Sequence, residues 1–581
     1  MKHHMSKTTA IATAVLIVFI ISLGILLWFA YHQGLIDDGL STAAVATTSD
    51  ECTDAAVLIL KQGGSAADAA ICASLCQGIV VPQASGIGGG FLATIYTKNT
   101  AEIVTLNSRE VAPLKATQEL YLDNERATVE GGLSIAVPTE VKGLHELHRR
   151  FGKLSWSRVL EPAIHVAEKG FKVPNYLARV LSQYEEKIRR TDGFKDFYVN
   201  PKTNEIYREG DTLKNPQLAE TLKIIAREGA NAIYSTEGSL GQKLVNEIQA
   251  NGGIVTMNDL RIYQPKFAPS VAVKLFQGDT LHTTNLPSSG SIFAFILNIL
   301  EGYKFHENSF DFHRGNKLIY HRIVEAFKFG FGFRTSLGDE TSEEVVETLL
   351  NVLDVDFANH IRAFINDEQT FNSSEYYRAN TSVTIDHGTG HISILAPNGD
   401  AVALTSTINS IFGSWVMSNS TGIIFNNEMD DFSLPTASDG LIQSTANSIK
   451  AGKSPMSSMI PMILVNEKHD ATLIVGGAGG IRIMTSLVLF LINHLYLKLS
   501  MEEALEMKRF HHQLQPMRVQ FEDGYDQPDI VEYLRQKGHA TVEAGPLLSA
   551  FASIIAISNR NGRVEFAIDP RRGGKGVIFD P

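Results

Sequence analysis

The feature that most constrains the fold is a set of paired alternating segments in the last third of the chain. Residues 391–408, HISILAPNGDAVALTSTI, contain two alternating runs joined by PNGD, in which Asn398-Gly399 is a strong signal for a tight turn. The same hairpin form recurs in PMILVNEKHDATLIVGGAGG and FASIIAISNRNGRVEFAID, and segments with a helical pattern (482–500 and 501–513) lie between them. Hairpins with helices between them predict antiparallel sheets layered with helices, and hence an α+β fold.

Length and charge narrow the class of protein further. The chain has 581 residues, enough for two average domains or one large domain, and its 44% hydrophobic content suits a globular protein. The formal net charge is -12 and no long basic run occurs. We therefore expect no nucleic-acid partner, because phosphate binding needs concentrated Lys and Arg.

A long apolar segment near the N-terminus predicts a membrane anchor. Residues 10–31 are uncharged and mostly apolar, and about 20 such residues cross the hydrocarbon core of a bilayer. Two lysines precede the segment and two aspartates follow it, which places residues 1–9 in the cytoplasm and the rest of the chain outside. A cleaved signal peptide is the alternative, but the segment is longer than a usual apolar signal region and lacks a convincing cleavage site. We expect a single-pass type II protein of the plasma membrane.

Three glycosylation sequons agree with an exterior location. They begin at Asn372, Asn380 and Asn419, and such sequons are modified in secreted chains. The chain also has three cysteines, Cys52, Cys72 and Cys76. An oxidising compartment permits one disulfide and one buried thiol, whereas three unpaired buried cysteines are the alternative.

Several motifs that suggest metal or cofactor chemistry fail on spacing. HELH places His145 and His148 three residues apart, whereas the zinc-protease motif needs four. SGIGGGF lacks the last glycine of the dinucleotide motif and precedes its strand instead of following it. His511 and His512 have no nearby ligands suited to a metal. We expect neither a metal nor a cofactor.

The segment DHGTGHIS, residues 386–393, places Thr389 between two glycines at the start of the first hairpin. A threonine hydroxyl is a weak nucleophile and needs a base, which its own α-amine supplies if the chain is cut between Gly388 and Thr389. Gly388 permits the strained backbone of such a cleavage site, and Gly390 leaves space beside the hydroxyl. The octapeptide by itself also fits a glycine-flanked strand start.

The motifs around Thr389 decide between these interpretations. DHGTGHISILAPNGDAVALTSTIN, FNNEMDDFS, SPMSSMIPMI and GGAGG occur in this order, and GGSAADAAI, SGIGGGF, LNSRE, YHRIVEAFKFG and RFHHQLQP occur elsewhere. Together they closely resemble the gamma-glutamyltransferases, which are N-terminal nucleophile hydrolases that cut themselves into two subunits. The resemblance implies a four-layer αββα sandwich. It also implies a large subunit of residues 32–388 that stays paired with a small catalytic subunit of residues 389–581.

The resemblance also implies the activity. Such an enzyme takes the γ-glutamyl group from glutathione or its conjugates onto threonine and passes it to water, an amino acid or a dipeptide. The implied catalytic residues are the nucleophile, a supporting threonine hydroxyl and two oxyanion-hole glycines: Thr389, Thr407, Gly479 and Gly480. The implied substrate-binding residues hold the α-carboxylate (Arg109, Ser457 and Ser458) and the α-ammonium (Asn409, Glu428 and Asp431).

These residue types are chemically sensible without the resemblance, because a guanidinium and two acids suit a zwitterionic amino-acid head group. Two positions depart from the family pattern. Gly390 stands where members carry Thr, Ser or Ala, and Ile411 stands where many vertebrate members carry Tyr. The second change leaves the balance between hydrolysis and transfer open. An acylase of other specificity and an unprocessed binding protein are the alternative functions.

The disulfide can also be assigned. Cys52 precedes one predicted helix and Cys76 lies on the next, so a helix hairpin can bring the two together, and family members with cysteines at this separation join them. Cys72 and Cys76 are one helical turn apart, which is poor geometry for a bridge. We expect a Cys52–Cys76 disulfide and a buried Cys72 thiol.

Overall fold

The structure is a computed structural model of the chain. It describes residues 22, 42–122, 124, 126–305, 317–339, 343–379, 388–434, 444–543 and 551–580.

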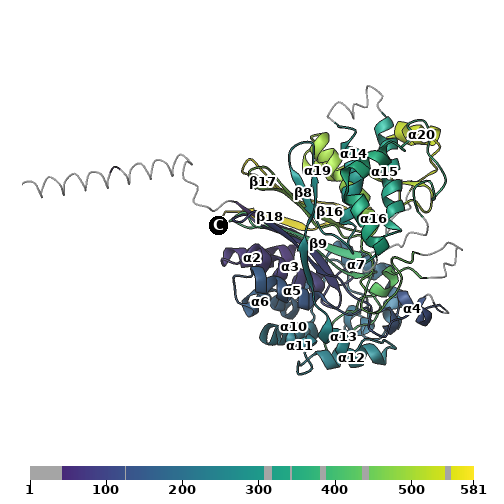
Figure 1. Cartoon of the computed structure of the whole chain (residues 1–581). Coiled ribbons are helices and arrows are strands. Elements are labelled where there is room, and N and C mark those ends of the chain that lie inside the picture. Colours follow the sequence, from purple (N-terminus) through teal and green to yellow (C-terminus); the bar gives the residue numbers. More distant parts are fainter. Residues whose placement is uncertain are drawn as a thin grey trace, which may run out of the picture.

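Two stacked antiparallel sheets form the centre of the molecule (Figure 1). The strands of the first sheet are β1 (Ala43–Thr47), β2 (Gly90–Thr97), β3 (Glu102–Ser108), β6 (Lys266–Pro269), β9 (Gly388–Leu395), β10 (Ala401–Asn409) and β18 (Lys575–Phe579). The strands of the second sheet are β7 (Val271–Lys274), β8 (Thr280–Thr283), β11 (Met462–Val465), β12 (Ala471–Ala478), β16 (Ser553–Arg560) and β17 (Arg563–Ile568). Their orders are β18-β1-β9-β10-β2-β3-β6 and β17-β16-β12-β11-β8-β7.

Helices cover the outer face of each sheet. The helices of the first half of the chain are α2 (Asp50–Lys61), α3 (Ala66–Val80), α4 (Arg126–Val129), α5 (Glu140–Phe151), α6 (Trp156–Lys169), α7 (Asn175–Gln183), α8 (Glu185–Arg190), α9 (Phe194–Tyr198), α10 (Pro216–Glu228), α11 (Asn231–Tyr234), α12 (Gly241–Ala250) and α13 (Met257–Ile262). Those of the second half are α14 (Gly290–Glu301), α15 (Leu318–Arg334), α16 (Glu343–Leu353), α17 (Val355–Arg362), α18 (Arg482–Leu491), α19 (Met501–Glu506) and α20 (Pro528–Gln536).

Short elements complete the described chain. Three-residue and four-residue 3-10 turns are η1 (Gln118–Leu120), η2 (Gly132–Ser134) and η5 (Glu428–Asp431), and a π-helical turn, η6 (Ile492–Tyr496), extends α18. Short strands outside the two large sheets are β4 (Phe171–Lys172), β5 (Thr212–Leu213), β13 (Phe510–His511), β14 (Val519–Phe521) and β15 (Thr541–Glu543).

Three hydrophobic cores hold these layers together. One core joins α2, α3, α5 and α6 to the first sheet, and a second joins α14, α15 and α18 to the second sheet. A third core lies between the sheets and contains small and branched side chains, among them Ala46, Ala403 and Ile474. The result is a helix–sheet–sheet–helix arrangement, and the prediction of antiparallel sheets layered with helices is confirmed.

The hairpins follow the registers that their turns predict. Thr405 lies opposite His391 in the β9–β10 pair, and β11–β12 and β16–β17 are also antiparallel pairs. The predicted helix over residues 501–513 is wrong in its second half. α19 ends at Glu506, and Phe510 and His511 pair with β14 because this segment is buried at a sheet edge, where the ladder replaces helical hydrogen bonds.

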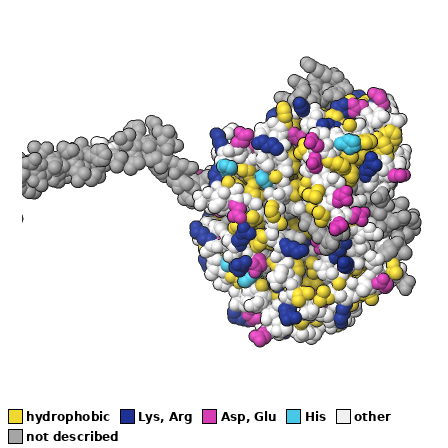
Figure 2. Space-filling view, in the orientation of Figure 1, with side chains coloured by type: hydrophobic (Ala, Val, Ile, Leu, Met, Phe, Trp, Pro, Cys, Tyr) yellow, Lys and Arg dark blue, Asp and Glu magenta, His cyan; other side chains and the backbone are white. Residues whose placement is uncertain are grey.

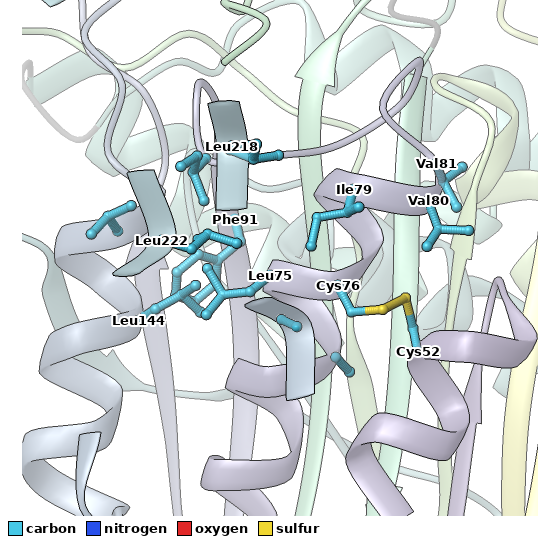
Figure 3. Packing of buried hydrophobic residues seen from close by; sticks show 14 of the residues in the cluster. Cys52, Leu75, Cys76, Ile79, Val80, Val81, Phe91, Leu144, Leu218 and Leu222 are labelled. Atoms are coloured by element: carbon cyan, nitrogen blue, oxygen red, sulfur yellow. A yellow bond between two sulfur atoms is a disulfide. The ribbon is translucent and has the colours of Figure 1, made fainter. Parts of the chain in front are cut away.

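The first two helices carry the cysteines (Figure 3). The Ser49 side chain caps α2, and Ser65 forms a capping box with Asp68 at the start of α3. A disulfide joins Cys52 to Cys76, with a Cα–Cα distance of 5.3 Å, and Cys72 is a buried thiol. Burial raises the pKa of the Cys72 thiol to about 12, which keeps it protonated and unreactive.

The predicted N-terminal anchor, residues 10–31, lies outside the described residues except for Ser22, as does the tail of residues 1–9. Within the described ranges, no helix combines the length and apolar character needed to cross a bilayer. Asn372 and Asn419 of the three sequons are exposed, and Asn380 is outside the described residues. Figure 2 shows charged side chains of both signs scattered over one face of the molecule.

Candidate active site

Thr389 lies at the start of β9 and is 5% exposed. The backbone N–H of Gly479 donates a hydrogen bond of 2.9 Å to the Thr389 hydroxyl. Gly388, the preceding residue, pairs with Asn409, and a Cβ at position 388 would lie 2.1 Å from the Asn409 carbonyl oxygen. A glycine is therefore required before the threonine for a packing reason in addition to its flexibility.

Thr407 lies on the neighbouring strand, β10, beside the Gly388–Thr389 peptide bond. Its hydroxyl donates a 2.5 Å hydrogen bond to the carbonyl oxygen of Gly388 and accepts one of 2.8 Å from the Asn409 N–H. A register shift between Ser406 and Asn409 places the hydroxyl there. Thr407 is thus aimed at the carbonyl whose carbon Thr389 would attack during self-cleavage.

Gly479 and Gly480 connect β12 to α18. Their φ angles are 144° and 61°, values that favour glycine. A Cβ at position 479 would lie 2.7 Å from the Cα of Ala552, so the backbone leaves no room for a side chain. The two N–H groups stand at the N-terminal end of α18, where the helix dipole favours negative charge. This geometry suits an oxyanion hole.

Arg109 forms the centre of a buried charged cluster. Its guanidinium, 1% exposed, makes ion pairs with Glu428 and Asp431 of η5. It also donates to the carbonyl oxygens of Pro455, at 3.4 Å, and Met456, at 3.1 Å. Burial alone would lower the pKa of Arg109, but the neighbouring carboxylates raise it above its ordinary value, so the guanidinium is fully charged.

The remaining predicted binding residues lie beside these two groups. Ser457 and Ser458 are buried and directly follow the carbonyls that Arg109 contacts. The Asn409 amide nitrogen donates to the Asn427 carbonyl at 3.2 Å, and its Oδ1 atom is buried with no hydrogen-bond partner among the described residues. Because Asn427 precedes Glu428, Asn409 connects the Thr389 group to the Arg109 cluster.

Two buried residues of the site were not predicted from the sequence. Glu110 lies 3.5 Å from Arg109, and burial raises the pKa of its carboxyl to about 8, although Arg109 acts in the opposite direction. Asn427 accepts from the Ser410 N–H at 2.9 Å and donates to the Val129 carbonyl. Their positions within LNSRE and FNNEMDDFS were the available signal, because each adjoins a residue that was singled out.

One other cluster has the composition of a metal site. Among the described residues, potential ligand atoms of His321, Glu325 and His539 lie within 4.8 Å of one another. His321 Nδ1 and His539 Nε2 are 2.9 Å apart, and Glu325 accepts hydrogen bonds from Thr370 and Tyr377. The ammonium of Lys328 lies 3.4 Å from Glu325 as well. This is the geometry of a buried hydrogen-bond network, because the ammonium repels a cation.

Two cavities of the described part have linings that do not include Thr389. A cavity of about 1150 Å³ lies at the hairpin ends of the strands and is lined by turn residues such as Asn398 and Gly399. A second, of about 260 Å³, lies beside Arg109 and is lined also by Asn107, Lys266 and Asp339. Hydrogen-bond geometry, and not cavity size, supports Thr389 as the predicted nucleophile.

The comparisons with known proteins agree with this geometry. The family described as Gamma-glutamyltranspeptidase matches residues 52–579. The chain belongs to this family. It is therefore an enzyme of the gamma-glutamyltranspeptidase type, and the resemblance inferred from the motifs is confirmed.

Two curated relatives cover nearly the whole chain. Scoloptoxin SSD14 of Scolopendra dehaani is 39% identical over 536 residues, 92% of this chain and 91% of the relative. Glutathione hydrolase 2 of Arabidopsis thaliana is 36% identical over 551 residues, 91% of this chain and 93% of the relative.

A solved structure is similar in fold. The cephalosporin acylase from Bacillus halodurans superposes with a TM-score of 0.78 at 23% sequence identity, covering 93% of this chain and 96% of that chain. At this level of identity, the likeness supports the mixed α+β fold alone.

Proposed function

We propose that this gamma-glutamyltranspeptidase cuts itself before Thr389 and then uses that threonine to transfer γ-glutamyl groups. The observation that carries the proposal is the placement of the Gly388–Thr389 bond. The Thr407 hydroxyl donates to its carbonyl oxygen, and the Thr389 hydroxyl follows directly. Attack by Oγ1 on the Gly388 carbon creates an oxyanion that Thr407 stabilises.

Collapse of this intermediate breaks the peptide C–N bond and leaves an ester between Gly388 and the Thr389 hydroxyl. Water hydrolyses the ester, which releases the Gly388 carboxylate and the free hydroxyl. The products are a large subunit, residues 32–388 with any N-terminal anchor, and a small subunit, residues 389–581, held together as a heterodimer by the shared sheet. The new α-amine of Thr389 serves as the base, because its pKa near 8 suits proton transfer at neutral pH.

The charges around Arg109 support an amino-acid head group. The guanidinium faces three buried carboxyl groups, Glu110, Glu428 and Asp431. An α-ammonium adds positive charge beside the acids, and an α-carboxylate accepts two parallel hydrogen bonds from the guanidinium. Asn409 Oδ1 is a further acceptor for the ammonium, and Ser457 and Ser458 are donors for the carboxylate. The γ-carbonyl then faces Thr389.

Acyl transfer proceeds in two steps. Thr389 Oγ1 attacks the γ-carbonyl of glutathione or a conjugate, the oxyanion binds the Gly479 and Gly480 N–H groups, and the α-amine protonates the leaving amine. Water, an amino acid or a dipeptide then takes the acyl group from the threonine. Ile411 is partly buried against the core of the first sheet, and it supplies no hydroxyl to position an acceptor amine.

The location is part of the proposal. The apolar segment of residues 10–31 anchors the chain in the plasma membrane, with the catalytic part outside. An oxidising exterior agrees with a Cys52–Cys76 bridge, and the exposed side chains of Asn372 and Asn419 are accessible to glycosylation.

A denaturing gel combined with an activity assay tests the function. The purified ectodomain should give two bands and release the γ-glutamyl group from glutathione, and a dipeptide acceptor should yield a transfer product. A single full-length band with no release would instead indicate an unprocessed binding protein. Two bands with activity on another acyl amide only would indicate an acylase.

A further inference from the structure

His391 lies two residues after Thr389 and has no role in the chemistry proposed above. Both side chains point into the space between the two sheets, because alternate residues of a strand share a face. The ring is 1% exposed. Burial lowers the pKa of the His391 imidazole to about 3, so the ring is neutral at physiological pH.

The ring and the Ser393 hydroxyl together connect four strands, β9, β10, β12 and β16, by side-chain hydrogen bonds. His391 Nδ1 is 2.8 Å from the Thr405 hydroxyl on β10, and Nε2 is 3.1 Å from the Ser393 hydroxyl on β9. The Ser393 hydroxyl donates across the sheet interface to the carbonyl oxygen of Ile474, at 3.2 Å, and of Ile555, at 3.4 Å. Since Ser393 donates there, it accepts from Nε2–H, and Thr405 donates to Nδ1.

The second sheet provides a fitted space for this ring. A Cβ built on Gly476 of β12 would lie 2.3 Å from His391 Cε1 and 2.5 Å from Nδ1. Gly476 therefore has to be a glycine because the imidazole occupies the place of its side chain. Three residues after Gly476, just beyond the end of β12, the Gly479 N–H donates to the Thr389 hydroxyl at 2.9 Å.

We propose that His391 is a positioning residue that fixes β9 against β12 and so sets the distance between Thr389 and the oxyanion hole. The inference rests on the proposed role of Thr389 as the nucleophile. Thr389 and the oxyanion hole belong to different sheets, and between sheets no backbone ladder fixes the register. The imidazole against Gly476 supplies a side-chain contact at this interface. His391 is the next residue after Thr389 on the same face of β9.

Self-cleavage and acyl transfer form their oxyanions in different places. During self-cleavage the oxyanion forms on Gly388 and faces Thr407, which lies in the same sheet as Thr389. During acyl transfer the oxyanion faces Gly479 in the other sheet. Loss of His391 should therefore impair acyl transfer and spare self-cleavage. Removal of an oxyanion donor lowers kcat by roughly 100-fold to 1000-fold, and a misplaced donor should lower it less.

The experiment compares His391→Ala with Ile474→Ala in the full-length protein. Ile474 is a fully buried side chain of the same interface and lies on β12, the strand that carries Gly476, so its loss also opens a cavity between the sheets. We expect His391→Ala to give two bands, with kcat for γ-glutamyl-p-nitroanilide lowered about 10-fold to 100-fold and KM within about threefold. Ile474→Ala should lower the melting temperature with kcat within about threefold.

Two further variants keep the test decisive if His391→Ala does not fold. Gly476→Ala drives a methyl group into the ring and should lower kcat in the same way. His391→Asn keeps a polar group near Nδ1 and should recover part of kcat. The double variant, His391→Ala with Gly476→Ala, has no clash between the new methyl group and the ring. It should regain the melting temperature that Gly476→Ala alone loses, but it should not regain kcat.

The inference is overturned if His391→Ala keeps kcat within threefold, if only KM changes, or if Ile474→Ala lowers kcat equally. Full recovery of kcat in the double variant would overturn it too, because packing alone would then suffice. Thr389→Ala, measured in parallel, separates the two proposals. An active Thr389→Ala protein contradicts the proposed function, whereas an inactive one beside a normal His391→Ala protein contradicts only the role of His391.

Discussion

At the scale of single residues, the site is built from atoms that are far apart in the sequence. The Gly388 carbonyl, the Thr407 hydroxyl and the Gly479 N–H surround one threonine. Arg109 and Asp431 meet although 322 residues separate them. Each of these contacts is one hydrogen bond or one ion pair. A single substitution can therefore remove one contact, and each substitution has its own expected effect on activity.

Thr389→Ala removes the proposed nucleophile of both proposed reactions. We expect one full-length band on a denaturing gel and no γ-glutamyl release, because neither the peptide bond nor the substrate can be attacked. Thr389→Ser, which keeps the hydroxyl, should still give two bands. Fragments with an unchanged new N-terminus in the alanine variant would mean that another protease makes the cut.

Asp431 and Asp430 form a matched pair within η5. Asp431 is paired with Arg109, whereas Asp430 accepts a hydrogen bond of 3.1 Å from Thr128. Loss of one partner of a buried charge pair costs about 2–5 kcal/mol, and 1.36 kcal/mol is tenfold in rate. Asp431→Asn should therefore lower kcat/KM roughly 30-fold or more, and Asp430→Asn should change it little.

Arg109→Ala should lower kcat/KM to a similar extent, since the α-carboxylate loses its cation, and Arg109→Lys should restore it only in part because lysine lacks the planar fork. Arg149→Ala, an exposed arginine of α5 (67%), is the control. Self-cleavage should survive all of these changes, because it needs no bound amino acid. The measurement is kcat/KM for γ-glutamyl-p-nitroanilide on processed protein, and normal values for both Arg109→Ala and Asp431→Asn would remove the head-group clamp.

At the scale of elements, two junctions place the chemistry. The bulge in β10 directs Thr407 toward β9, and the sharp turn from β12 into α18 aims the Gly479 N–H at Thr389. The α2–α3 hairpin, which packs on the first sheet, has a structural role instead, because the disulfide closes it. These features depend on backbone shape and chain connection more than on side-chain charge.

Gly479→Ala tests the β12–α18 turn. The φ angle of 144° and the 2.7 Å approach to the Ala552 Cα leave no strain-free place for a methyl group. The N–H should move away from Thr389, and kcat should fall roughly 100-fold or more. Gly562→Ala, at the β16–β17 turn, also has a positive φ but meets nothing within 4 Å, so its kcat should stay near normal.

The α2–α3 hairpin predicts a measurable contribution from the disulfide. Cys52 and Cys76 are 24 residues apart, and a bridge over such a loop stabilises by about 2–4 kcal/mol. The double variant Cys52→Ser with Cys76→Ser should lose about that much in the free energy of unfolding, whereas Cys72→Ala should lose less. Peptide mapping without reduction should recover Cys52 linked to Cys76, and a linked peptide containing Cys72 would contradict the pairing.

At the scale of the whole molecule, burial of titratable groups sets the response to pH. Burial lowers the pKa of His391 and His511 to about 3 and of His539 to about 2. It raises the pKa of Glu110 to about 8 and of Glu140 to about 7. The histidines are therefore uncharged in the fold at neutral pH, and the two acids retain protons that they lose when the chain unfolds.

The buried histidines and the two buried acids change the free energy of unfolding in opposite directions as the pH falls. Below about 6.5 the unfolded chain binds protons on the histidines and the folded chain does not, so stability is lost by up to about 1.4 kcal/mol per pH unit for each histidine. Between about 8 and 4.5 the folded chain holds more protons on the two acids, which adds stability and offsets part of this loss.

We therefore expect the urea midpoint to fall gently from pH 6.5 to 4.5 and steeply below 4.5, where these acids are protonated in both states. Unfolding curves at half-unit intervals from pH 3.5 to 7 are the measurement. A midpoint that does not change below pH 4.5 would contradict the burial of neutral histidines.

The sequence by itself determined the features that depend on neighbours along the chain. Alternation and the Asn398-Gly399 turn predicted the β9–β10 hairpin, because side-chain period and turn chemistry are local. The motifs around Thr389 identified the family and predicted the site residues. The tertiary structure alone decided which distant atoms meet. It placed Glu110 against Arg109, ended α19 before Phe510, and seated His391 on Gly476. Such contacts follow from the packing of one sheet on another, which no local pattern encodes.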